Sequence, residues 1–399
     1  MGKIGVWLAG AKGAIATTLL VGASALARGL TKPLGLVTEL PEFASLGLVS
    51  LDRLVFGGWD VVSTSSVERA RELAYADRML PGDLVESVRG ELEAFDGRIC
   101  AGFIANGIPS LSSSGLDHKE SLSATVKRLE RDLEHFRNEH NLQNVIVVNL
   151  TPTEPPLPLA PEHKQLDGFR KLIEENRYSQ LTPSILYAYI ALGQGLPFVN
   201  FTPSVSVTLP ALLELAKLRE VPFCGSDGKT GETLLKAVLA PLFRSRNLEV
   251  LSWQGFNILG GGDGEVLNDP SSKRAKVESK ERVLEATLGY RPHSGVFIEY
   301  VPSLGNWKTA WDFIHFRGFL GTKMSVQFTW QGCDAILAAP LVLDLVRLAE
   351  FAHRNGEVGA LSHLACFFKN PQGTDVHSFP DQFRLLLDYV ERHACKVNQ

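Results

Sequence analysis

Short apolar runs alternate with amphipathic segments through the first half of this chain, and this alternation restricts the fold most strongly. Candidate strands lie at residues 4–8, 53–56, 99–104, 145–150, 198–201 and 221–224. The intervening segments carry apolar side chains at the three-to-four spacing of a helix, at residues 14–28, 66–76, 122–140, 184–193 and 210–217. Strands that alternate with helices predict an α/β domain with a Rossmann-like, doubly wound parallel sheet.

The pattern of the sequence changes near Asp227. Longer, partly alternating runs at 250–258, 296–301 and 324–330 predict an inserted α+β domain with an open sheet. A strongly apolar helix is expected over 335–355, beginning near Pro340, and would return the chain to the first domain. We therefore expect residues 1–225 plus 335–399 to form the Rossmann-like domain and residues 226–334 to form the insert.

The composition argues against some classes of binding partner. The 399 residues carry a formal charge of −4, so no general basic field favours nucleic acid or an anionic membrane surface. The five cysteines form no Cys-x-x-Cys pair and the ten histidines show no metal-binding spacing, so we expect reduced thiols and assign no metal site. Gly10, Lys12 and Gly13 interrupt the apolar N-terminal run, which favours a strand-turn-helix over a secretory signal. These features predict a cytoplasmic protein.

A glycine-rich turn after the first candidate strand is the first chemical candidate. Gly10 and Gly13 would let backbone amides approach a pyrophosphate, and the start of the next helix would favour its charge. Lys12 occupies the position of the glycine that normally allows this close approach, so its side chain would either pair with phosphate or obstruct it. Asp60 could accept hydrogen bonds from an adenosine ribose. The alternative is a plain tight turn that caps a helix.

A second candidate lies at the domain junction. Residues 225–233 combine small residues, hydroxyls and the start of a helix, which together can form an anion cradle. The order of residues is not that of the phosphate-binding Walker loop. An ordinary Thr or Asp N-cap is the alternative.

A stripe of lysines marks a third candidate, on a helix expected from residue 273. Lys273, Lys276 and Lys280 share one helix face, where like charges repel unless an anion faces them. A phosphorylated substrate is one such anion. A solvated surface, neutralised by Glu278, Glu281 and Glu285 nearby, is the alternative.

Together these blocks resemble the myo-inositol-phosphate synthase family. The resemblance covers nearly the whole chain and is strongest from Thr182 onward. The matching blocks are residues 58–60, 182–188, 199–203, 225–236, 256–264, 273–280, 298–312, 333–340 and 361–369.

The resemblance implies an isomerase that cyclises glucose 6-phosphate to inositol phosphate with NAD that is not consumed. Carbon 5 would be oxidised, carbon 6 would lose a proton, the enolate would attack the aldehyde at carbon 1, and the ketone would be reduced again. The resemblance also implies a homotetramer assembled through the insert, and leaves open a divalent or monovalent cation.

The same resemblance implies roles for individual residues. Lys276 and Lys369 would transfer protons and stabilise the oxyanion at carbon 5, with Asp227, Asp263 and Asp334 as orienting or charge partners. The substrate phosphate would be held by Lys280, Lys308, Thr230, Gly231, Glu232 and Thr233. The cofactor would be held by Gly10, Lys12, Gly13, Ala14, Ile15, Thr17, Asp60, Thr151, Pro152, Thr202, Asp227, Gly262 and Asp263.

Several positions depart from the family pattern. Residues 10–16 correspond to the family's Gly-x-Gly-Gly-Asn-Asn-Gly turn. Lys12 and Ala16 each replace a glycine, and Ala14 and Ile15 replace the two asparagines. Gly261-Gly262 replace an asparagine pair, residues 204–206 lack a Gln-Asn pair, and Glu232 stands where glutamine is usual. A carboxylate at 232 would repel phosphate unless it turns away or pairs with a lysine. A paralogue acting on another sugar phosphate, or a non-catalytic sensor of nucleotide or sugar phosphate, therefore stays open.

Overall fold

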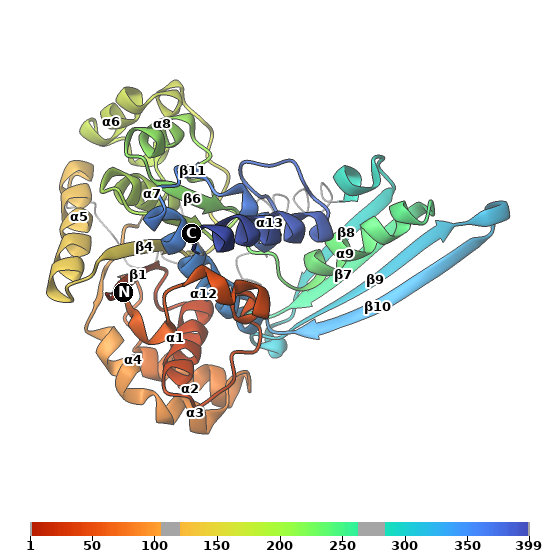
Figure 1. Ribbon diagram of the computed structural model, residues 1–399, viewed down its shortest axis with the longest axis horizontal. Coiled ribbons are helices and arrows are strands. Elements are labelled where there is room, and N and C mark those ends of the chain that lie inside the picture. Colours follow the sequence, from red (N-terminus) through yellow and green to blue (C-terminus); the bar gives the residue numbers. More distant parts are fainter. Residues whose placement is uncertain (1, 105–119, 262–283, 398–399) are drawn as a thin grey trace.

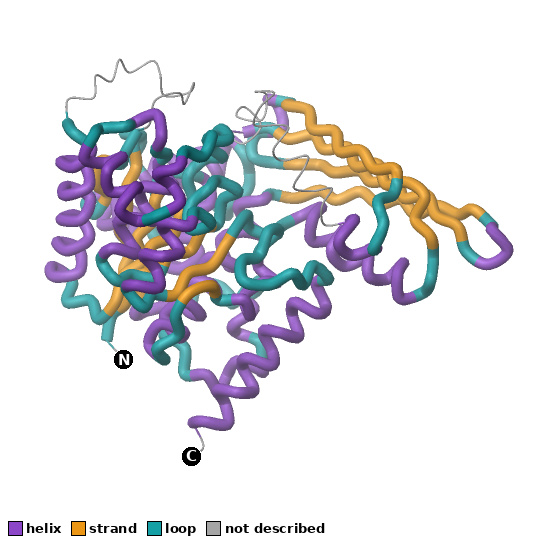
Figure 2. The backbone as a smooth tube through the Cα atoms, turned by 90° about the horizontal axis from the view of Figure 1, so that it is seen from above, coloured by secondary structure: helices purple, strands orange, loops and turns teal. Residues whose placement is uncertain are grey.

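The chain forms two separate β-sheets in the computed structural model, which describes residues 2–104, 120–261 and 284–397. A seven-stranded sheet has the order β11-β6-β5-β4-β1-β2-β3, and a four-stranded sheet has the order β10-β9-β7-β8. In Figure 1 the four-stranded sheet projects from one side of the body that holds the other sheet, and Figure 2 shows the same projection from above. This arrangement confirms the α/β class with a second, open sheet.

All pairs in the seven-stranded sheet are parallel. Its strands are β1 (Ile4–Ala9), β2 (Leu54–Asp60), β3 (Ile99–Ala101), β4 (Asn144–Asn149), β5 (Phe198–Asn200), β6 (Pro222–Gly225) and β11 (Gly359–Ala360). Alternate residues of one strand enter opposite cores: Val6 packs on one face and Trp7 on the other. Burial on both faces explains why the strands near the middle of the sheet, such as β1 and β4, read as continuous apolar runs.

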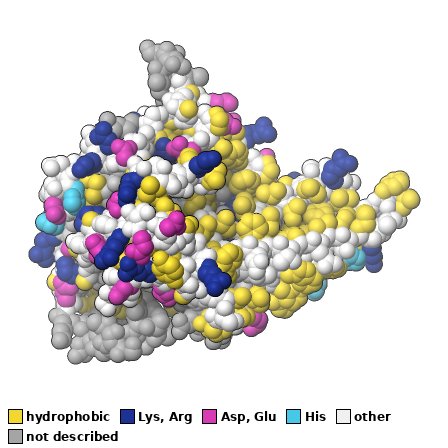
Figure 3. Space-filling model, turned by 90° about the horizontal axis from the view of Figure 1, so that it is seen from below, with side chains coloured by type: hydrophobic (Ala, Val, Ile, Leu, Met, Phe, Trp, Pro, Cys, Tyr) yellow, Lys and Arg dark blue, Asp and Glu magenta, His cyan; other side chains and the backbone are white. Residues whose placement is uncertain are grey.

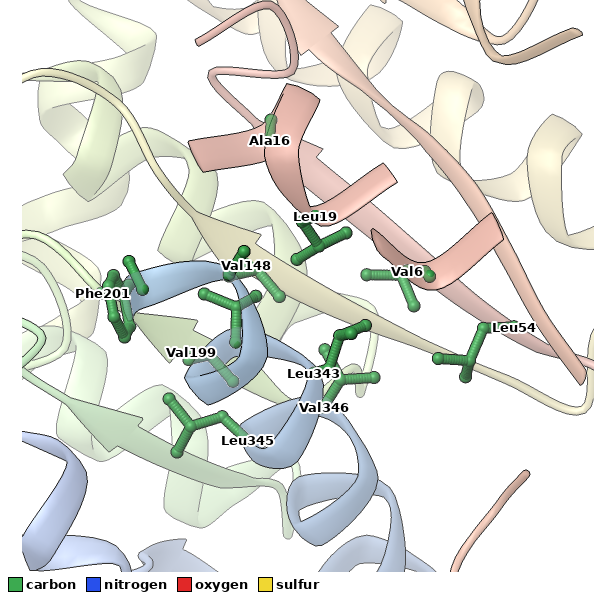
Figure 4. Packing of buried hydrophobic residues seen from close by; sticks show 14 of the residues in the cluster. Val6, Ala16, Leu19, Leu54, Val148, Val199, Phe201, Leu343, Leu345 and Val346 are labelled. Atoms are coloured by element: carbon green, nitrogen blue, oxygen red, sulfur yellow. The ribbon is translucent and has the colours of Figure 1, made fainter. Parts of the chain in front are cut away.

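Helices cover both faces of this sheet. Figure 4 shows Leu19 of α1 (Ala14–Ala27) and Leu343 of α12 (Asp334–Arg354) near Val6 and Val148 in one core. The core on the other face includes residues of α5 (Leu122–Glu139), α6 (Leu166–Glu174), α7 (Pro183–Gly193) and α8 (Pro210–Leu218). Among the described residues, this body also contains α2 (Ser66–Arg71), the π-helical turn η4 (Glu72–Ala76), α3 (Gly82–Ser87), α4 (Arg89–Asp96) and α13 (Phe379–Val397).

The four-stranded sheet is mixed. Its strands are β7 (Glu249–Leu259), β8 (His293–Tyr300), β9 (Lys308–Arg317) and β10 (Lys323–Gly332), and only the pair β7–β8 is parallel. The helix α9 (Gly231–Ser245) packs Ala240 and Phe243 against Trp253 and Ile314 on one face. Short 3-10 helices connect elements at Val37–Glu39, Pro41–Leu46, Leu51–Arg53, Pro161–Lys164, Tyr178–Gln180, Pro302–Leu304, Phe319–Gly321 and Ser362–Phe367.

Several elements differ from the sequence-based expectation. The strands β9 and β11 and the helices α3, α4, α6 and α13 were not predicted. The helix α12 begins at Asp334 rather than near Pro340, which lies in its second turn. Among the described residues, no helix is both long and apolar enough to cross a lipid bilayer.

Candidate functional site

The order of the parallel strands reverses between β1 and β4, and the loops that follow these two strands touch. Gly10 has a φ of +85°, and a Cβ added there would lie 2.8 Å from the carbonyl oxygen of Leu150. The amides of Gly10 and Ala11 also donate to the carbonyl of Trp59 at 3.0 and 3.2 Å. Only glycine fits this contact at Gly10. The crevice at such a reversal is where open α/β sheets bind ligands.

The turn from β1 into α1 offers backbone amides rather than side chains. Gly13 is exposed at the N-cap and has no side chain that could compete with an anion for the first amides. The hydroxyl of Thr17 points into the helix and donates to the Gly13 carbonyl at 3.0 Å. Ala14 and Ile15 are half-buried. The backbone at this helix start fits a dinucleotide pyrophosphate, since free amides and the helix dipole favour an anion.

Asp60 ends β2 beside this turn. Its Oδ2 accepts from the Lys12 amide at 2.7 Å, and its Oδ1 accepts from the amides of Val61 and Val62 at 2.7 and 2.9 Å. The carboxylate therefore holds the loop after β2 against the glycine turn. It lies at the strand end from which a Rossmann acidic residue reaches the ribose.

The side chain of Lys12 turns into the protein. Its ammonium pairs with Asp96 at the end of α4 and lies 3.4 Å from the hydroxyl of Ser66, and only 8% of the side chain is exposed. Ser66 also donates its amide to both carboxylate oxygens of Asp96, at 3.1 and 3.0 Å. Lys12 thus ties the turn to α2 and α4 instead of facing the crevice.

Replacing Lys12 with methionine is expected to leave NAD affinity within about threefold of the wild-type value, because the Lys12 ammonium already pairs with Asp96. Calorimetric titration with NAD measures this directly. A loss of affinity of about tenfold or more, which is about 1.4 kcal/mol, would instead place the Lys12 ammonium on the pyrophosphate.

Buried polar side chains join the carboxyl ends of β4 and β5. Asn149 donates to the Ser184 hydroxyl at 2.8 Å and to Oδ1 of Asn200 at 3.1 Å. The Thr151 hydroxyl donates to Oδ1 of Asn149 at 2.8 Å, and that of Thr202 donates to Oδ1 of Asn200 at 3.1 Å. Two of the expected cofactor residues, Thr151 and Thr202, thus belong to one network. Pro152, which was also expected to contact the cofactor, follows Thr151 directly and is exposed.

Glu154 is anchored in the same network. Its Oε1 accepts from the amide and hydroxyl of Ser184 at 2.8 and 2.9 Å, while Oε2 is buried and accepts no hydrogen bond from the described residues. The residue as a whole is half-exposed, but its carboxyl lies inside the fold. Burial raises the pKa of Glu154 to about 7, and the bonds from Ser184 and Thr182 oppose this shift.

Glu154 should make stability depend on pH. Its pKa is higher in the folded than in the unfolded state, so its contribution is complete below about pH 4.5 and is lost as pH rises through about 7. Glu154→Gln should remove this dependence, on the order of 3 kcal/mol across that window. Urea unfolding of both proteins at pH 5 and pH 8 measures the difference. Equal pH slopes would show that this carboxyl is ionised throughout.

Asp227 and Lys369 come together across a short antiparallel contact. The Lys369 ammonium donates to Oδ1 of Asp227 at 2.7 Å, and the Lys369 amide donates to the Asp227 carbonyl at 2.7 Å. The Asp227 amide in turn donates to the carbonyl of Thr202 at 3.0 Å, which brings the pair to the end of β5. Both side chains are about nine-tenths buried. The second carboxylate oxygen of Asp227 is buried and accepts no hydrogen bond from the described residues, so it is placed to meet a donor from a ligand.

The anion cradle lies at the start of α9. Thr230 occupies the N-cap, but its hydroxyl donates to Oδ1 of Asp334 at 3.2 Å instead of capping the helix. The Lys308 ammonium lies 3.3 Å from Oδ2 of the same aspartate. Asp334 therefore joins the first residue of β9 to the helix start, where Gly231 and Thr233 are buried. An anion here would meet the Lys308 ammonium and the positive end of α9.

Glu232 turns away from this cradle into a buried charge cluster. Lys236, one turn later on α9, lies 2.5 Å from Oε1 of Glu232 and 3.7 Å from Oδ1 of Asp312. The three side chains are at most 1% exposed, and the Trp253 indole donates to Asp312 at 2.7 Å. A Cβ on Gly255 would lie 2.6 Å from Glu232, so glycine leaves the room that the cluster needs. The repulsion expected between Glu232 and phosphate is thus reduced by an ion pair with Lys236.

Some expected residues lie outside the described ranges: Gly262, Asp263, Lys276 and Lys280. Sequence reasoning did not single out Lys236, although its position four residues after Glu232 is the spacing of a helical ion pair. It also did not single out Lys229, whose ammonium bonds to Gln382 and whose pKa is lowered by burial to about 8. No group of three or more His, Cys, Asp or Glu able to hold a metal ion occurs within the described ranges.

Comparison with known proteins decides the family. The model of an NAD-binding family described as myo-inositol-1-phosphate synthase matches residues 4–390. The chain belongs to the myo-inositol-1-phosphate synthase family. It is similar to inositol-3-phosphate synthase 1 of Bacteroides thetaiotaomicron, with 34% identity over 96% of this chain and 91% of that protein. It is also 29% identical to the inositol-3-phosphate synthase of Spirodela polyrhiza, over 89% of this chain and 73% of that one.

Solved structures of the synthase family share the fold. The inositol-3-phosphate synthase of Caenorhabditis elegans superposes with a TM-score of 0.86 at 24% identity, covering 98% of this chain and 86% of that one. A myo-inositol-1-phosphate synthase-related protein from Thermotoga maritima gives 0.77 at 24% identity, covering 98% of both. The chain is therefore an inositol-3-phosphate synthase-like enzyme of the isomerase class, with the NAD-binding domain of that family.

Proposed function

We propose that this enzyme converts glucose 6-phosphate to myo-inositol phosphate without net oxidation or reduction. The observation that carries the proposal is the buried Asp227–Lys369 pair, because it places an amine and a carboxylate beside the strand ends where family members are expected to bind NAD. Bound NAD would supply the removal of hydride from carbon 5 and its later return.

The residues around the crevice fit this cofactor. The amides of the Gly10–Gly13 turn and the start of α1 would hold the pyrophosphate, and Asp60 would face the adenosine ribose. Thr151 and Thr202, with Pro152, would line the nicotinamide half, where the polar network keeps the two strand ends in place. Lys12 supports the turn from behind.

The Lys369 amine would accept the proton of the carbon 5 hydroxyl when this carbon is oxidised, and would return it when the ketone is reduced. Asp227 would orient the Lys369 amine through Oδ1, and its buried Oδ2 would accept a hydrogen bond from the sugar or the nicotinamide amide. By the family pattern, Lys276 would share proton transfer and oxyanion stabilisation with Lys369, and Gly262 and Asp263 would approach the cofactor.

The phosphate would bind at the start of α9. Lys308, with Lys280 by the family pattern, would supply positive charge, and the backbone from Thr230 to Thr233 would supply amides. The Glu232 side chain would stay below the site, paired with Lys236.

A paralogous reaction on another sugar phosphate is the second candidate. The observation that favours it is Glu232, since a carboxylate under the cradle replaces a neutral family residue. Such an enzyme would keep the lysine chemistry and bind a different sugar.

The test is incubation of the purified protein with glucose 6-phosphate and a small amount of NAD, followed by phosphorus NMR. Inositol phosphate in excess of the NAD added supports the synthase reaction. NAD binding without product rejects glucose 6-phosphate as substrate and favours the paralogue. Absence of NAD binding rejects both enzymes and favours a sensor of sugar phosphates.

The four-stranded sheet suggests how chains assemble. Phe256, Phe297 and Trp311 are 41%, 47% and 38% exposed on the face away from α9. The ring of Phe256 lies 4.6 Å from that of Phe297 and 5.4 Å from that of Trp311. Hydrophobic side chains also gather along the projecting sheet on the face seen in Figure 3. We propose that residues 226–334 form the catalytic and oligomerisation domain of a cytoplasmic homotetramer, with residues 1–225 plus 335–399 as the NAD-binding domain. Sedimentation giving the mass of one chain at micromolar concentration would reject the tetramer.

A further inference from the structure

Asp77 lies just after η4, in the body that holds the seven-stranded sheet. It accepts hydrogen bonds from the loop that immediately precedes Lys308. Its Oδ1 accepts from the Asn306 amide at 3.3 Å, and its Oδ2 accepts from the Asn306 side chain at 2.5 Å. Its carbonyl accepts from the Trp307 indole at 2.7 Å. These contacts join residues 229 positions apart in the sequence and connect the two β-sheets.

The gripped loop has little room to move. Gly305 has a φ of +54°, and a Cβ there would lie 2.1 Å from Oδ1 of Asp77. On the opposite side, a Cβ on Gly260 at the end of β7 would lie 2.5 Å from the Gly305 carbonyl oxygen. The loop is therefore wedged between Asp77 and the end of β7, and glycines on both sides permit this contact.

A π-helical turn directs Asp77 toward the loop. The helix that begins as α2 widens at Glu72–Ala76, and the Asp77 amide closes the turn on the carbonyl of Glu72 at 3.2 Å. Single π turns inside α-helices are frequent at functional sites, since they redirect the residues that follow. The first residue of the same helix, Ser66, binds Asp96, the partner of Lys12. The first residue of this helix thus contacts Asp96, which pairs with Lys12 of the glycine turn. Asp77, at the other end of the helix, contacts the loop before Lys308.

The charge of Asp77 also reaches the start of α12. Burial, together with the charges of Asp334 and Asp77, raises the pKa of the Cys333 thiol to about 11. Cys333 directly precedes Asp334, the residue that contacts both Lys308 and Thr230.

We propose that Asp77 is a positioning residue that fixes Lys308 toward the anion cradle from across the junction between the two sheets. Asn306 and Trp307 transmit the constraint, because Lys308 follows them directly and begins β9. The inference rests on the proposed function, since it takes Lys308 as a ligand of the substrate phosphate.

The test compares Asp77→Ala, Asp77→Asn and the charge-matched control Asp83→Ala in the full-length protein with NAD bound. Asp77→Ala should raise KM for glucose 6-phosphate about tenfold, with kcat and NAD affinity within about twofold, because a charge-assisted bond to the loop is lost. Asp77→Asn should recover part of this loss, since its carbonyl can still accept from Asn306. Asp83, exposed on α3, should tolerate alanine without effect. An unchanged KM for Asp77→Ala, or an equal loss in the control, would overturn the proposal.

Hydrogen exchange separates this inference from the proposed function. Asp77→Ala should speed exchange of the amides of Gly305 and Trp307, which bond to Pro302 and Leu304 at 3.2 and 3.0 Å, while leaving β1 and β4 unchanged. Failure of the wild-type protein to bind glucose 6-phosphate would reject the proposed function and the role of Lys308 with it. If the sugar phosphate binds but exchange at these amides is unchanged, the positioning role alone is overturned.

Discussion

Lys369→Ala should lower turnover of glucose 6-phosphate by about 10³-fold, which is the scale of a lost general acid–base group. The ammonium of this lysine bonds to Oδ1 of Asp227 in a site where both side chains are about nine-tenths buried. Truncation removes the proposed proton carrier and leaves the Asp227 carboxylate without this partner. The rate of inositol phosphate formation, followed by phosphorus NMR, gives the size of the effect.

Two controls make the Lys369 result specific. NAD affinity of Lys369→Ala should stay within about threefold of the wild type, because the Gly10 turn and Asp60 lie on other loops. Asp227→Asn keeps an acceptor for Lys369 and should lose less activity than the alanine variant. Turnover of Lys369→Ala within about tenfold of the wild type would contradict the assigned role.

Lys236→Met should destabilise the folded protein by about 3–5 kcal/mol, the typical cost of removing one partner from a buried ion pair. The change leaves Glu232 and Asp312 in the interior without the ammonium that lies 2.5 and 3.7 Å from them. The midpoint and slope of urea unfolding measure the loss.

The double variant Glu232→Gln with Lys236→Met should recover part of this stability, because one of the two carboxylates is then neutral. Lys217→Met, at an exposed position on α8, should change stability by less than about 0.5 kcal/mol. A Lys236→Met protein as stable as the wild type would mean that the cluster is not ionised as described.

Six strands of the seven-stranded sheet could be predicted from the sequence, because those near the middle of the sheet are buried on both faces. The two-residue strand β11 was not predicted. Val145 to Val148 alternate between the two cores, so every residue is apolar and the run is continuous. The strand β9 was missed because a charged residue interrupts its buried face. Ala310, Ile314 and Phe316 are buried on one face, but Asp312 takes an inward position between them and breaks the apolar pattern. Its partners, Lys236 and Trp253, are distant in sequence.

The candidate site was predictable only where its parts are local. The glycine turn and the start of α9 can be read from short segments, because each is a strand or loop followed directly by a helix. The direction of Lys12 depends on Asp96, and the pairing of Lys369 depends on Asp227 across the fold. The contact of Asp77 with Asn306 depends on a π turn that no sequence pattern indicated.

We expect the hydride removed from carbon 5 to return to the same molecule. Glucose 6-phosphate carrying deuterium at carbon 5 should be incubated with the enzyme and a small amount of unlabelled NAD, and the inositol phosphate examined by mass spectrometry. One deuterium is expected in nearly every product molecule, because the reduced cofactor keeps the label until the ring has closed. Inositol phosphate without deuterium would contradict this expectation.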